Sequence, residues 1–207
     1  MALHLSWEDV RQRPSLAHAM HADRKRVFVD TLRWDLQHDG EIERDEFDDE
    51  YATYLILRDK GGEDHLSSIR LLDTDRPHIL GDIFPFLCEG EVPRGPDIRE
   101  ITRFCASPRY RAAERLSARN MMARALIELG HKTGISAYTA VCDIGFLQQV
   151  LAAGWRCQPL GLPQPYQGGL IGAFMIFVDA DSLDRMSPGW QYDQPVLRVE
   201  DRSVLAA

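Results

Sequence analysis

The sequence predicts an α/β sandwich, in which a mixed sheet carries helices on its faces. Three observations support this fold class. Apolar residues recur at helical spacing in the segments 15–36 and 113–129, segments rich in strand formers alternate with the expected helices, and glycines or prolines separate the segments. Helices that alternate with strands build layered folds of this kind. The length of 207 residues fits a single domain.

The first expected helix covers residues 15–36 and has a charged residue, Arg24, on its apolar face. That face consists of Ala17, Met20, Arg24, Val27, Phe28 and Thr31. The acidic segment 39–50, DGEIERDEFDDE, follows it. Its eight acidic residues follow neither the helical nor the strand period, which predicts a loop or an irregular lid.

The next segments are expected to be strands. Residues 51–58 and 65–72 are rich in strand formers, and the pair Gly61-Gly62 between them favours a hairpin turn. Residues 98–106, IREITRFCA, are expected to form a further strand, because side chains at alternate positions would face opposite sides of the sheet.

Two further helices are expected after a stretch of loops. Prolines recur through residues 77–96, which predicts loops and short turns there. Residues 113–129 carry an apolar stripe at helical spacing, and we expect Gly130 to end that helix. Asp143 is expected to cap a helix over residues 144–153.

The remaining strands complete the predicted order. Residues 136–142 and 170–178 read as strands, and Asp179 or Asp181 is expected to cap a short final helix. The predicted order is therefore helix, hairpin, strand, helix, strand, helix and strand. GNAT-type acyltransferases have such an order, as do other α/β proteins.

Charge and composition argue against several classes of protein. The 24 lysines and arginines stand against 32 acidic residues, giving a net charge of -8, whereas nucleic-acid-binding proteins usually show the opposite balance. No apolar run reaches the roughly 20 residues that a membrane span needs. The N-terminus lacks the basic start and apolar stretch of a secretory signal, so we expect a cytoplasmic protein.

Common catalytic and metal-binding motifs are absent from the sequence. There is no G-x-S-x-G, no Walker A loop and no G-x-G-x-x-G after a strand. His18 and His21 are three residues apart, but no third ligand accompanies them, so no metal site is expected. Without a C-x-x-C pair, we expect reduced thiols at Cys88, Cys105, Cys142 and Cys157.

Several charged residues lie in apolar company and define a candidate site. A buried charge is costly unless it is paired, so these residues need partners. Together with acids of the 39–50 segment, they predict a polar pocket for a ligand that carries both an amine and a carboxylate. The alternatives are a structural ion pair between Glu100 and an arginine, or solvated side chains. The residues concerned are Arg24, Arg70, Glu100, Arg103, Asp45 and Asp48.

Trp34 has two interpretations at this stage. It lies at the end of the first expected helix, where a core tryptophan is the simpler interpretation. The other is a stacking platform for a planar or cationic ligand.

The pattern resembles the acyl-homoserine-lactone synthases, which are the LuxI-type autoinducer synthases. Order, residue identity and spacing match from residue 24 to 104. The matching stretches are Arg24-Lys-Arg-Val27-Phe28, Trp34-Asp35, Asp45-Glu-Phe-Asp48, Arg70-Leu-Leu and Glu100-Ile-Thr-Arg103-Phe104. The second half of the chain is compatible in the order of its elements.

The resemblance implies a fold and a reaction. The fold is a GNAT-like three-layer α/β/α sandwich with a mixed, V-splayed central sheet, built as one domain over 1–207. The part 15–105 would bind S-adenosylmethionine, and the part 106–207 would bind the acyl group and its carrier. The acyl group passes from acyl carrier protein to the amine of S-adenosylmethionine, which is a substrate rather than a cofactor. Lactonisation then releases methylthioadenosine, and no resident cofactor or metal is implied.

The resemblance also implies roles for residues. Glu100 is the expected general base for the amine, and Arg103 and Arg70 are the other expected catalytic residues. The expected S-adenosylmethionine site comprises Arg24, Phe28, Trp34, Asp45, Asp48, Arg103 and Phe104. Such residue types suit the ligand, because carboxylates and aromatic faces attract its cations and an arginine fork binds its carboxylate.

The second half of the chain offers an acyl site and a docking site. Basic residues interrupt the acidic sequence and are expected to dock the anionic acyl carrier protein, unless they form a solvated helix face. These are Arg111, Arg115, Arg119 and Arg124, with Arg103 and Arg109 before them. The expected acyl pocket comprises Phe84, Met121, Met122, Cys142, Phe146 and Trp155, each of which could equally be core.

Two other functions stay open at the level of sequence. One is a GNAT-type N-acyltransferase that uses acyl-CoA and another amine. The other is a non-catalytic regulator that binds acyl or adenosyl groups on the same fold. The complete set of matching charged residues argues against the regulator.

Overall fold

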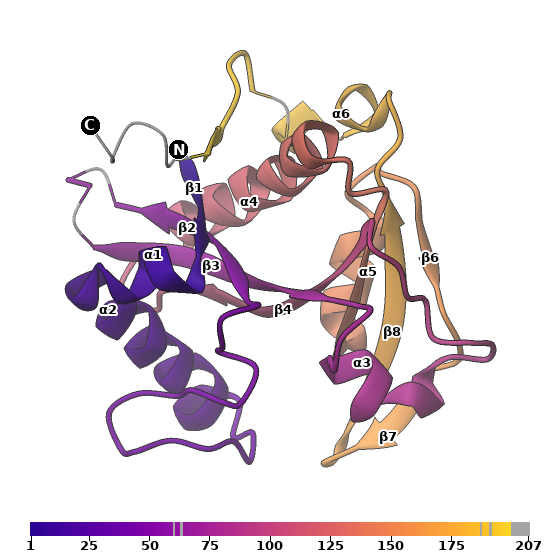
Figure 1. Cartoon of the computed structure of the whole chain (residues 1–207), viewed down its shortest axis with the longest axis horizontal. Helices are drawn as coiled ribbons and strands as arrows, with labels where there is room; N and C mark the ends of the chain where they lie inside the picture. The colour runs from indigo at the N-terminus through magenta and orange to yellow at the C-terminus, as the bar shows by residue number, and fades with distance from the viewer. Residues whose placement is uncertain (60, 63, 187, 191, 200–207) are drawn as a thin grey trace. The chain divides into compact units, whose positions relative to one another are not determined.

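The computed structural model describes residues 1–59, 61–62, 64–186, 188–190 and 192–199 (Figure 1). The chain divides into two compact units with interleaved segments. Unit 1 comprises Met1–Arg70, Arg103–Ala125 and Gln194–Ala207, and unit 2 comprises Leu71–Thr102 and Leu126–Asp193. Strands β3 (His65–Asp73) and β4 (Ile98–Ala106) contribute residues to both units. Each unit is described by itself below.

The strands of unit 1 follow the order β3-β2-β1-β9. Strand β1 (Ala2–Ser6) pairs antiparallel with β2 (Thr53–Arg58) and parallel with β9 (Leu197–Val199). Strand β3 (His65–Asp73) follows β2 as the expected hairpin partner, and the unit contains it as far as Arg70. The sheet side chains Leu5, Leu55 and Leu57 are at most 1% exposed and form part of the core.

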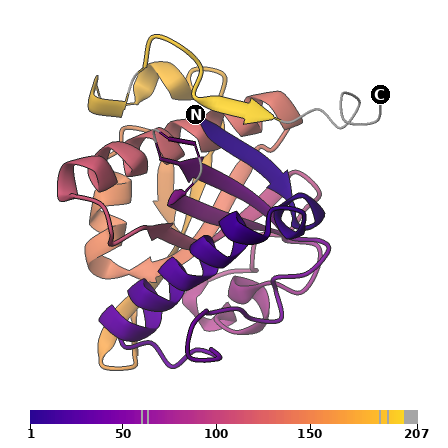
Figure 2. The ribbon, with the colours of Figure 1, turned by 90° about the vertical axis from the view of Figure 1, so that its left-hand side faces the viewer.

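The helices of unit 1 are α1 (Trp7–Arg11), α2 (Pro14–Arg24), the π-helix η1 (Lys25–Thr31) and the first part of α4 (Ala112–Thr133). Ser6 begins α1 with a capping box, in which its side chain accepts from the Asp9 amide and Asp9 binds back. In Figure 2, helix α2 runs across the front of the strands of this unit.

The first expected helix is shorter than its predicted range of 15–36. The α-helical part ends at Arg24, the π-turns end at Thr31, and the last five predicted residues are not helical. Arg33 has a φ of 61°, in the left-handed region that ends a helix. The Trp34 amide then donates to the carbonyl of Phe28, so the chain folds back on the helix end.

The strands of unit 2 also pair in both parallel and antiparallel directions. The first residues of β4 (Ile98–Ala106) pair parallel with β5 (Ala137–Asp143), which pairs antiparallel with β8 (Gly169–Phe177). The short strands β6 (Cys157–Pro159) and β7 (Gln164–Tyr166) both pair antiparallel with β8. Parallel and antiparallel pairs in one sheet, together with the helices, confirm the predicted α/β class.

The helices of unit 2 include two in the segment that was expected to form loops. They are α3 (Ile79–Asp82) and the 3-10 turn η2 (Pro85–Leu87). The others are the end of α4, α5 (Ile144–Leu151), α6 (Ser182–Arg185) and the 3-10 turn η3 (Pro188–Trp190). Asp143 caps α5 as predicted, because its side chain accepts from the Phe146 amide at 2.9 Å.

Helix α4 continues past Gly130, so the prediction that this glycine ends the helix was wrong. The helix ends at Thr133, and Gly134 follows with a φ of 78°. Gly130 serves close packing instead. A Cβ atom at that position would lie 2.8 Å from Val178 Cγ1 and 3.0 Å from the Ile135 carbonyl oxygen.

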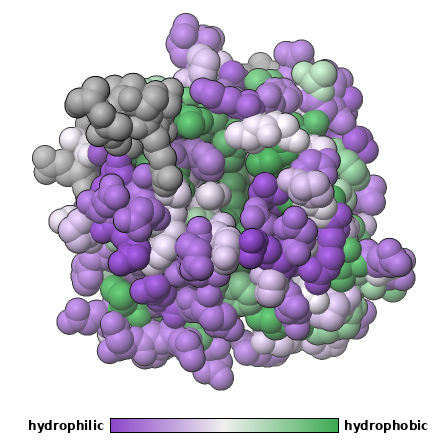
Figure 3. Space-filling view, viewed as in Figure 1, coloured by the Kyte–Doolittle hydropathy of each residue, from purple (hydrophilic) through white to green (hydrophobic). Residues whose placement is uncertain are grey.

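The surface in Figure 3 is mostly hydrophilic, with smaller apolar areas between the polar side chains. This agrees with a chain in which 27% of residues are charged. All four cysteines are free thiols, as expected, and Cys105 is buried. Within the described residues, no helix is both long and apolar enough to cross a membrane.

Candidate active site

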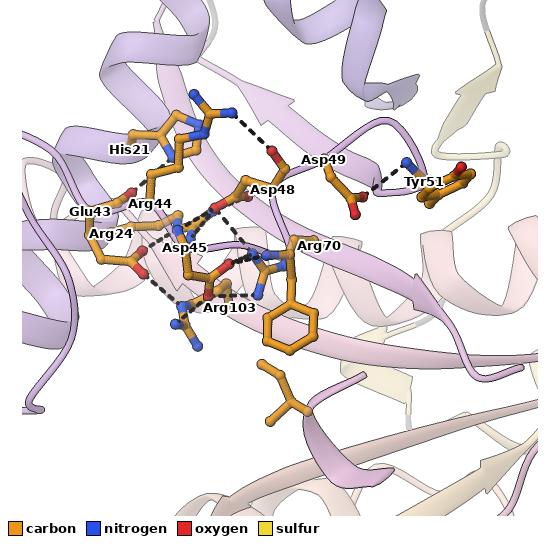
Figure 4. A network of polar contacts seen from close by, with 12 residues as sticks. His21, Arg24, Glu43, Arg44, Asp45, Asp48, Asp49, Tyr51, Arg70 and Arg103 are labelled. Atoms are coloured by element: carbon orange, nitrogen blue, oxygen red, sulfur yellow. Dashed lines mark hydrogen bonds and ion pairs between the residues drawn. The ribbon is translucent and has the colours of Figure 1, made fainter. Parts of the chain in front are cut away.

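Three arginines and three carboxylates of unit 1 form one connected network, which we call the charge cluster (Figure 4). They come from the end of α2, the acidic loop, β3 and β4. Each arginine binds two carboxylates, and each carboxylate binds two arginines. The members are Arg24, Arg70, Arg103, Glu43, Asp45 and Asp48.

Arg24 forms the buried base of the charge cluster. Its Nε donates to Glu43 Oε2 at 2.6 Å, and its two terminal nitrogens donate to the two oxygens of Asp48 at 2.8 and 2.9 Å. Burial alone would lower the pKa of Arg24, but Asp48 and Glu43 outweigh burial and raise it. The sequence analysis placed this arginine on an apolar helix face, and the acidic loop supplies its partners.

Arg70 projects from β3 between two aspartates. It donates to both oxygens of Asp45 and lies 3.1 Å from Asp48 Oδ2. Its guanidinium also lies 5.8 Å from the centre of the Phe47 ring. The arginine side chain is completely buried, and Asp48 raises its pKa although burial opposes this. Arg70 therefore fixes the acidic loop against the sheet.

Arg103 completes the charge cluster from β4. Its Nε donates to Glu43 Oε1 at 3.1 Å, and a terminal nitrogen donates to Asp45 Oδ2 at 2.7 Å. The residue has a φ of 49°, a left-handed conformation that is uncommon for a residue other than glycine. Such conformations cluster at functional sites, where surrounding contacts hold them. The two carboxylates are such contacts.

The charge cluster is neutral overall and reaches solvent at one edge. Three positive and three negative side chains balance one another. Four of the six side chains are at most 1% exposed, whereas Asp45 is 11% and Arg103 is 9% exposed. A ligand can therefore meet the cluster through Asp45 and Arg103, which we call the exposed edge. Burial would raise the pKa of Asp45, but Arg70 and Arg103 outweigh it and lower the pKa.

Polar neighbours hold the acidic loop in place. The Tyr54 hydroxyl donates to Asp48 Oδ1 at 2.7 Å, and Arg44 donates to the Asp48 carbonyl at 3.1 Å. His21 Nδ1 lies 3.0 Å from the carbonyl oxygen of Glu43. Burial, aided by the charge of Arg24, lowers the pKa of His21 to about 4, so this ring is neutral near pH 7.

An aromatic pair lies beside Arg103. The rings of Phe28 and Trp34 stack with their centres 5.0 Å apart, and the Arg103 guanidinium lies 5.8 Å from the Phe28 ring centre. Phe28 is 4% exposed, whereas Trp34 is 36% exposed. Trp34 is therefore not a core residue, and its exposed ring suits the stacking interpretation.

Glu100 belongs to unit 2, where it binds the start of α3. Its two oxygens accept the backbone amides of Ile79 at 2.8 Å and Leu80 at 2.7 Å. The side chain is fully buried. The structure thus gives Glu100 a capping contact that the sequence did not indicate, and its expected role as a base stays a prediction.

The expected acyl-pocket residues lie in several elements. Met121 and Met122 belong to the part of α4 in unit 1. The unit 2 members are Phe84 before η2, Cys142 in β5, Phe146 in α5 and Trp155 after α5. Met122 and Trp155 are buried, and the other four are partly buried. Their grouping into one pocket stays a prediction, as does a role for the partly buried Phe104.

The expected docking residues lie directly before α4 and along the part of α4 in unit 1. Arg111 is exposed, and Arg115, Arg119 and Arg124 are partly exposed. Arg109 differs from them, because Asp23 and Asp64 both bind its guanidinium. The basic stretch is therefore not one uniform surface.

Sequence reasoning missed four polar residues around the cluster. Glu43 is the most important, since it joins Arg24 to Arg103. Its loop has no periodicity, so nothing in the pattern separated this acid from its seven acidic neighbours. A buried arginine on a helix face does signal that a nearby acidic loop must supply a partner. The others are His21, Arg44 and Tyr54.

The fold places the protein in the GNAT-like class of α/β proteins, to which N-acyltransferases belong. A narrower assignment comes from the family model described as autoinducer synthase, which matches residues 8–186. The chain belongs to the autoinducer synthase family, which confirms the resemblance found in the sequence. It is an enzyme, an acyltransferase of the acyl-homoserine-lactone synthase kind.

Individual relatives agree with this family. An acyl-homoserine-lactone synthase from Acinetobacter nosocomialis is 30% identical over 162 residues, which is 75% of this chain and 88% of the relative. The structure of MesI, a CoA-dependent acyl-homoserine lactone synthase, is 25% identical with a TM-score of 0.83, over 95% of this chain and 98% of MesI. TofI, solved in a ternary complex with an inhibitor and MTA, is 28% identical with a TM-score of 0.70, over 84% of this chain and 92% of TofI.

Proposed function

We propose that this enzyme joins an acyl group to the amine of S-adenosylmethionine and then closes the homoserine lactone ring. The observation that carries the proposal is the exposed edge, where a carboxylate and a guanidinium lie next to each other beside an exposed tryptophan. S-adenosylmethionine carries an ammonium, a carboxylate, a sulfonium and a purine. Asp45 suits the ammonium or the sulfonium, Arg103 suits the carboxylate, and Trp34 suits a planar or cationic group.

The buried members of the charge cluster have a different role in this proposal. Arg24, Arg70 and Asp48 have no exposed side-chain surface beyond 1%. They therefore act as positioning residues that hold the exposed edge, instead of touching substrate. Arg70 was expected to be a catalytic residue, and in this proposal it is a positioning residue instead.

The reaction has two steps. The substrate ammonium first loses a proton, and the free amine attacks the thioester carbonyl, forming the amide and releasing the thiol. A carboxylate oxygen of the intermediate then attacks the γ-carbon, and the carbon–sulfur bond breaks. The sulfonium leaves as neutral methylthioadenosine. The second step needs mainly an in-line arrangement, since the leaving group is already present. The MTA bound to TofI supports this product.

Glu100 is the proposed acceptor of the ammonium proton, directly or through water. The family match supports the assignment, since this residue belongs to the stretch Glu100-Ile-Thr-Arg103-Phe104 that resembles the family. Its carboxylate already accepts two amides of α3, so a base function would have to work alongside this capping contact.

Acyl carrier protein is the proposed acyl donor. The basic residues Arg111 and Arg115 support it, because the carrier and its phosphopantetheine arm are anionic. The segment 107–117, SPRYRAAERLS, contains no glycine, whereas acetyl-CoA-dependent GNAT enzymes place a glycine-rich pyrophosphate loop before the corresponding helix. The second candidate is acyl-CoA, which the likeness to the CoA-dependent MesI favours.

One experiment tests both the reaction and the donor. The purified enzyme is incubated with S-adenosylmethionine and matched sets of acyl carrier proteins and acyl-CoA thioesters of equal chain length. Mass spectrometry then detects acyl-homoserine lactone and methylthioadenosine. Both products at a 1:1 ratio are expected, with the higher kcat/KM for the carrier. Acylation of a different amine, without methylthioadenosine, would replace the proposal by a general N-acyltransferase.

A further inference from the structure

A second charged network lies in unit 1 around Asp23. The Asp23 side chain is fully buried and lies 2.8 Å from His65 Nδ1. It also accepts from Arg26 at 2.8 Å and from Arg109 at 3.1 and 2.9 Å. Burial would raise the pKa of Asp23, but hydrogen bonds from His65, Arg109 and Ser107 outweigh it and lower the pKa. The acid is therefore charged and depends on these partners.

Arg109 joins three segments of unit 1 through this network. Besides Asp23 in α2, its guanidinium binds both carboxylate oxygens of Asp64 and donates to the carbonyl of His65 at 3.2 Å. Asp64 directly precedes β3, His65 is its first residue, and Arg109 lies in the turn between β4 and α4. One planar, five-donor side chain thus connects a helix end, a strand start and a turn.

The network around Asp23 continues directly into the charge cluster. Arg24 follows Asp23 on the last turn of α2, and both side chains are buried but enter different networks. Arg24 binds Glu43, and Glu43 binds Arg103 at the exposed edge. A displacement of the α2 end would therefore pass through two ion pairs to the surface where the substrate is proposed to bind.

We propose that Arg109 is a positioning residue of this enzyme, which fixes the end of α2 so that Arg24 holds the exposed edge in its binding geometry. It is therefore not a contact for the acyl donor, although it lies in the basic stretch of the sequence. The kinetic consequences rest on the proposed use of S-adenosylmethionine. The structural consequence, a fixed α2 end, does not depend on it.

The test compares the wild type with Arg109→Met and Arg109→Lys. S-adenosylmethionine affinity is measured by titration calorimetry, and kcat and KM are measured for both substrates. Arg109→Met is expected to weaken S-adenosylmethionine binding about tenfold and to lower kcat, with an unchanged KM for the acyl donor. Arg109→Lys is expected to recover little, because an ammonium keeps the charge but cannot donate to both oxygens of Asp23 as the guanidinium fork does.

Two variants serve as matched controls. Asp64→Asn weakens the ion pair between Arg109 and residue 64 but leaves the ion pair between Arg109 and Asp23. This variant is therefore expected to bind S-adenosylmethionine as the wild type does. Arg111→Met removes a nearby exposed charge and is expected to raise only the KM of the acyl donor. Hydrogen exchange in the absence of substrate gives an independent readout. The Glu43 amide, which donates to the His21 carbonyl at 3.2 Å, should exchange faster in Arg109→Met.

The possible results separate the two proposals. An Arg109→Met variant that raises only the KM of the donor would make Arg109 a docking residue and overturn this inference. A folded variant with wild-type affinity, kcat and exchange would also overturn it. Failure of the wild type to bind S-adenosylmethionine would instead refute the proposed function, and the exchange of the Glu43 amide would then decide the positioning role alone.

Discussion

Arg24 binds both oxygens of Asp48 through its two terminal nitrogens, at 2.8 and 2.9 Å, and neither side chain has appreciable exposed surface. A fork of this kind joins the end of α2 to the acidic loop. Arginine is suited to such a position because its donors match the two carboxylate oxygens in one plane. The pair therefore makes the loop conformation depend on a single helix residue.

Removal of this arginine is expected to destabilise the fold. Arg24→Met leaves Asp48 and Glu43 buried with fewer partners, which should lower the free energy of unfolding by about 3 to 5 kcal/mol. Arg24→Lys should lose less, because it keeps the charge without the fork. Urea unfolding measures the difference, with the exposed Arg11→Met as a control expected within about 0.5 kcal/mol of the wild type. Equal stability of Arg24→Met and the wild type would contradict the importance of the pair.

Stability should fall as the pH falls from 6.5 to 4, in part because of His21. Its pKa is about 4 in the folded protein and about 6.5 when unfolded. Between these values the unfolded chain binds a proton that the folded protein does not, so lowering the pH favours unfolding. The contribution is about 3 kcal/mol over the whole window, and it is constant above pH 6.5.

Comparison of two histidine variants isolates this contribution. His21→Gln should have a flatter dependence of unfolding free energy on pH between 6.5 and 4 than the wild type. His18→Gln provides the control, since His18 lies three residues earlier on the same helix and is exposed. Parallel pH profiles for the wild type and His21→Gln would show that His21 is not the titrating group.

The sequence predicted those parts of the fold and site that rest on local patterns. Alternation in IREITRFCA predicted β4 with the residues 98–106 that the structure has. A charged residue on an apolar helix face likewise identified Arg24 as buried. Both patterns involve only residues that lie within a few positions of one another, so they can be recognised in a single sequence.

Features that depend on long-range contacts were not predictable in this way. Gly130 looked like a helix end, but it is a point of contact with Val178, which lies 48 residues later in the sequence. Glu43 is one of eight acids in a loop without periodicity, and only the fold brings it to Arg24 and Arg103. In the sequence Arg109 does not differ from its basic neighbours, and only the fold brings Asp23 and Asp64 to its guanidinium.

Glu100→Gln is expected to fold and to lose most activity. An amide cannot accept the ammonium proton, so kcat should fall on the order of a hundredfold if Glu100 is the base. Exchange of the Ile79 and Leu80 amides reports separately on the cap of α3, because both donate to this carboxylate. Glu114→Gln, an exposed change, is the control. Near-wild-type turnover of a folded Glu100→Gln would remove this residue from the mechanism.

Charge reversal directly before and along α4 tests the docking site. Replacement of Arg111, Arg115 and Arg119 by glutamate should raise the KM for acyl carrier protein and weaken the salt dependence of kcat/KM. S-adenosylmethionine affinity should not change, since the three are not members of the charge cluster. The triple variant Arg11→Glu, Arg185→Glu and Arg198→Glu controls for net charge, because it reverses the same number of charges at exposed residues. An unchanged KM for the carrier at low salt would return this stretch to a solvated helix face.

Binding of S-adenosylmethionine should protect the acidic loop and the chain around Trp34 from hydrogen exchange. Three arginines already balance the three loop carboxylates of the charge cluster, so a ligand adds contacts only at the exposed edge and at Trp34. Protection should therefore concentrate in residues 34–36 and 45–47 within the broader expected range 34–50. Asp45→Asn should reduce it by lowering affinity, while Asp39→Asn, a change at an exposed loop position, should leave it intact. Because coupling between sites is reciprocal, a variant that loosens the loop must also bind S-adenosylmethionine more weakly. Protection that appears only outside residues 34–50 would place the substrate elsewhere and refute the role of the exposed edge.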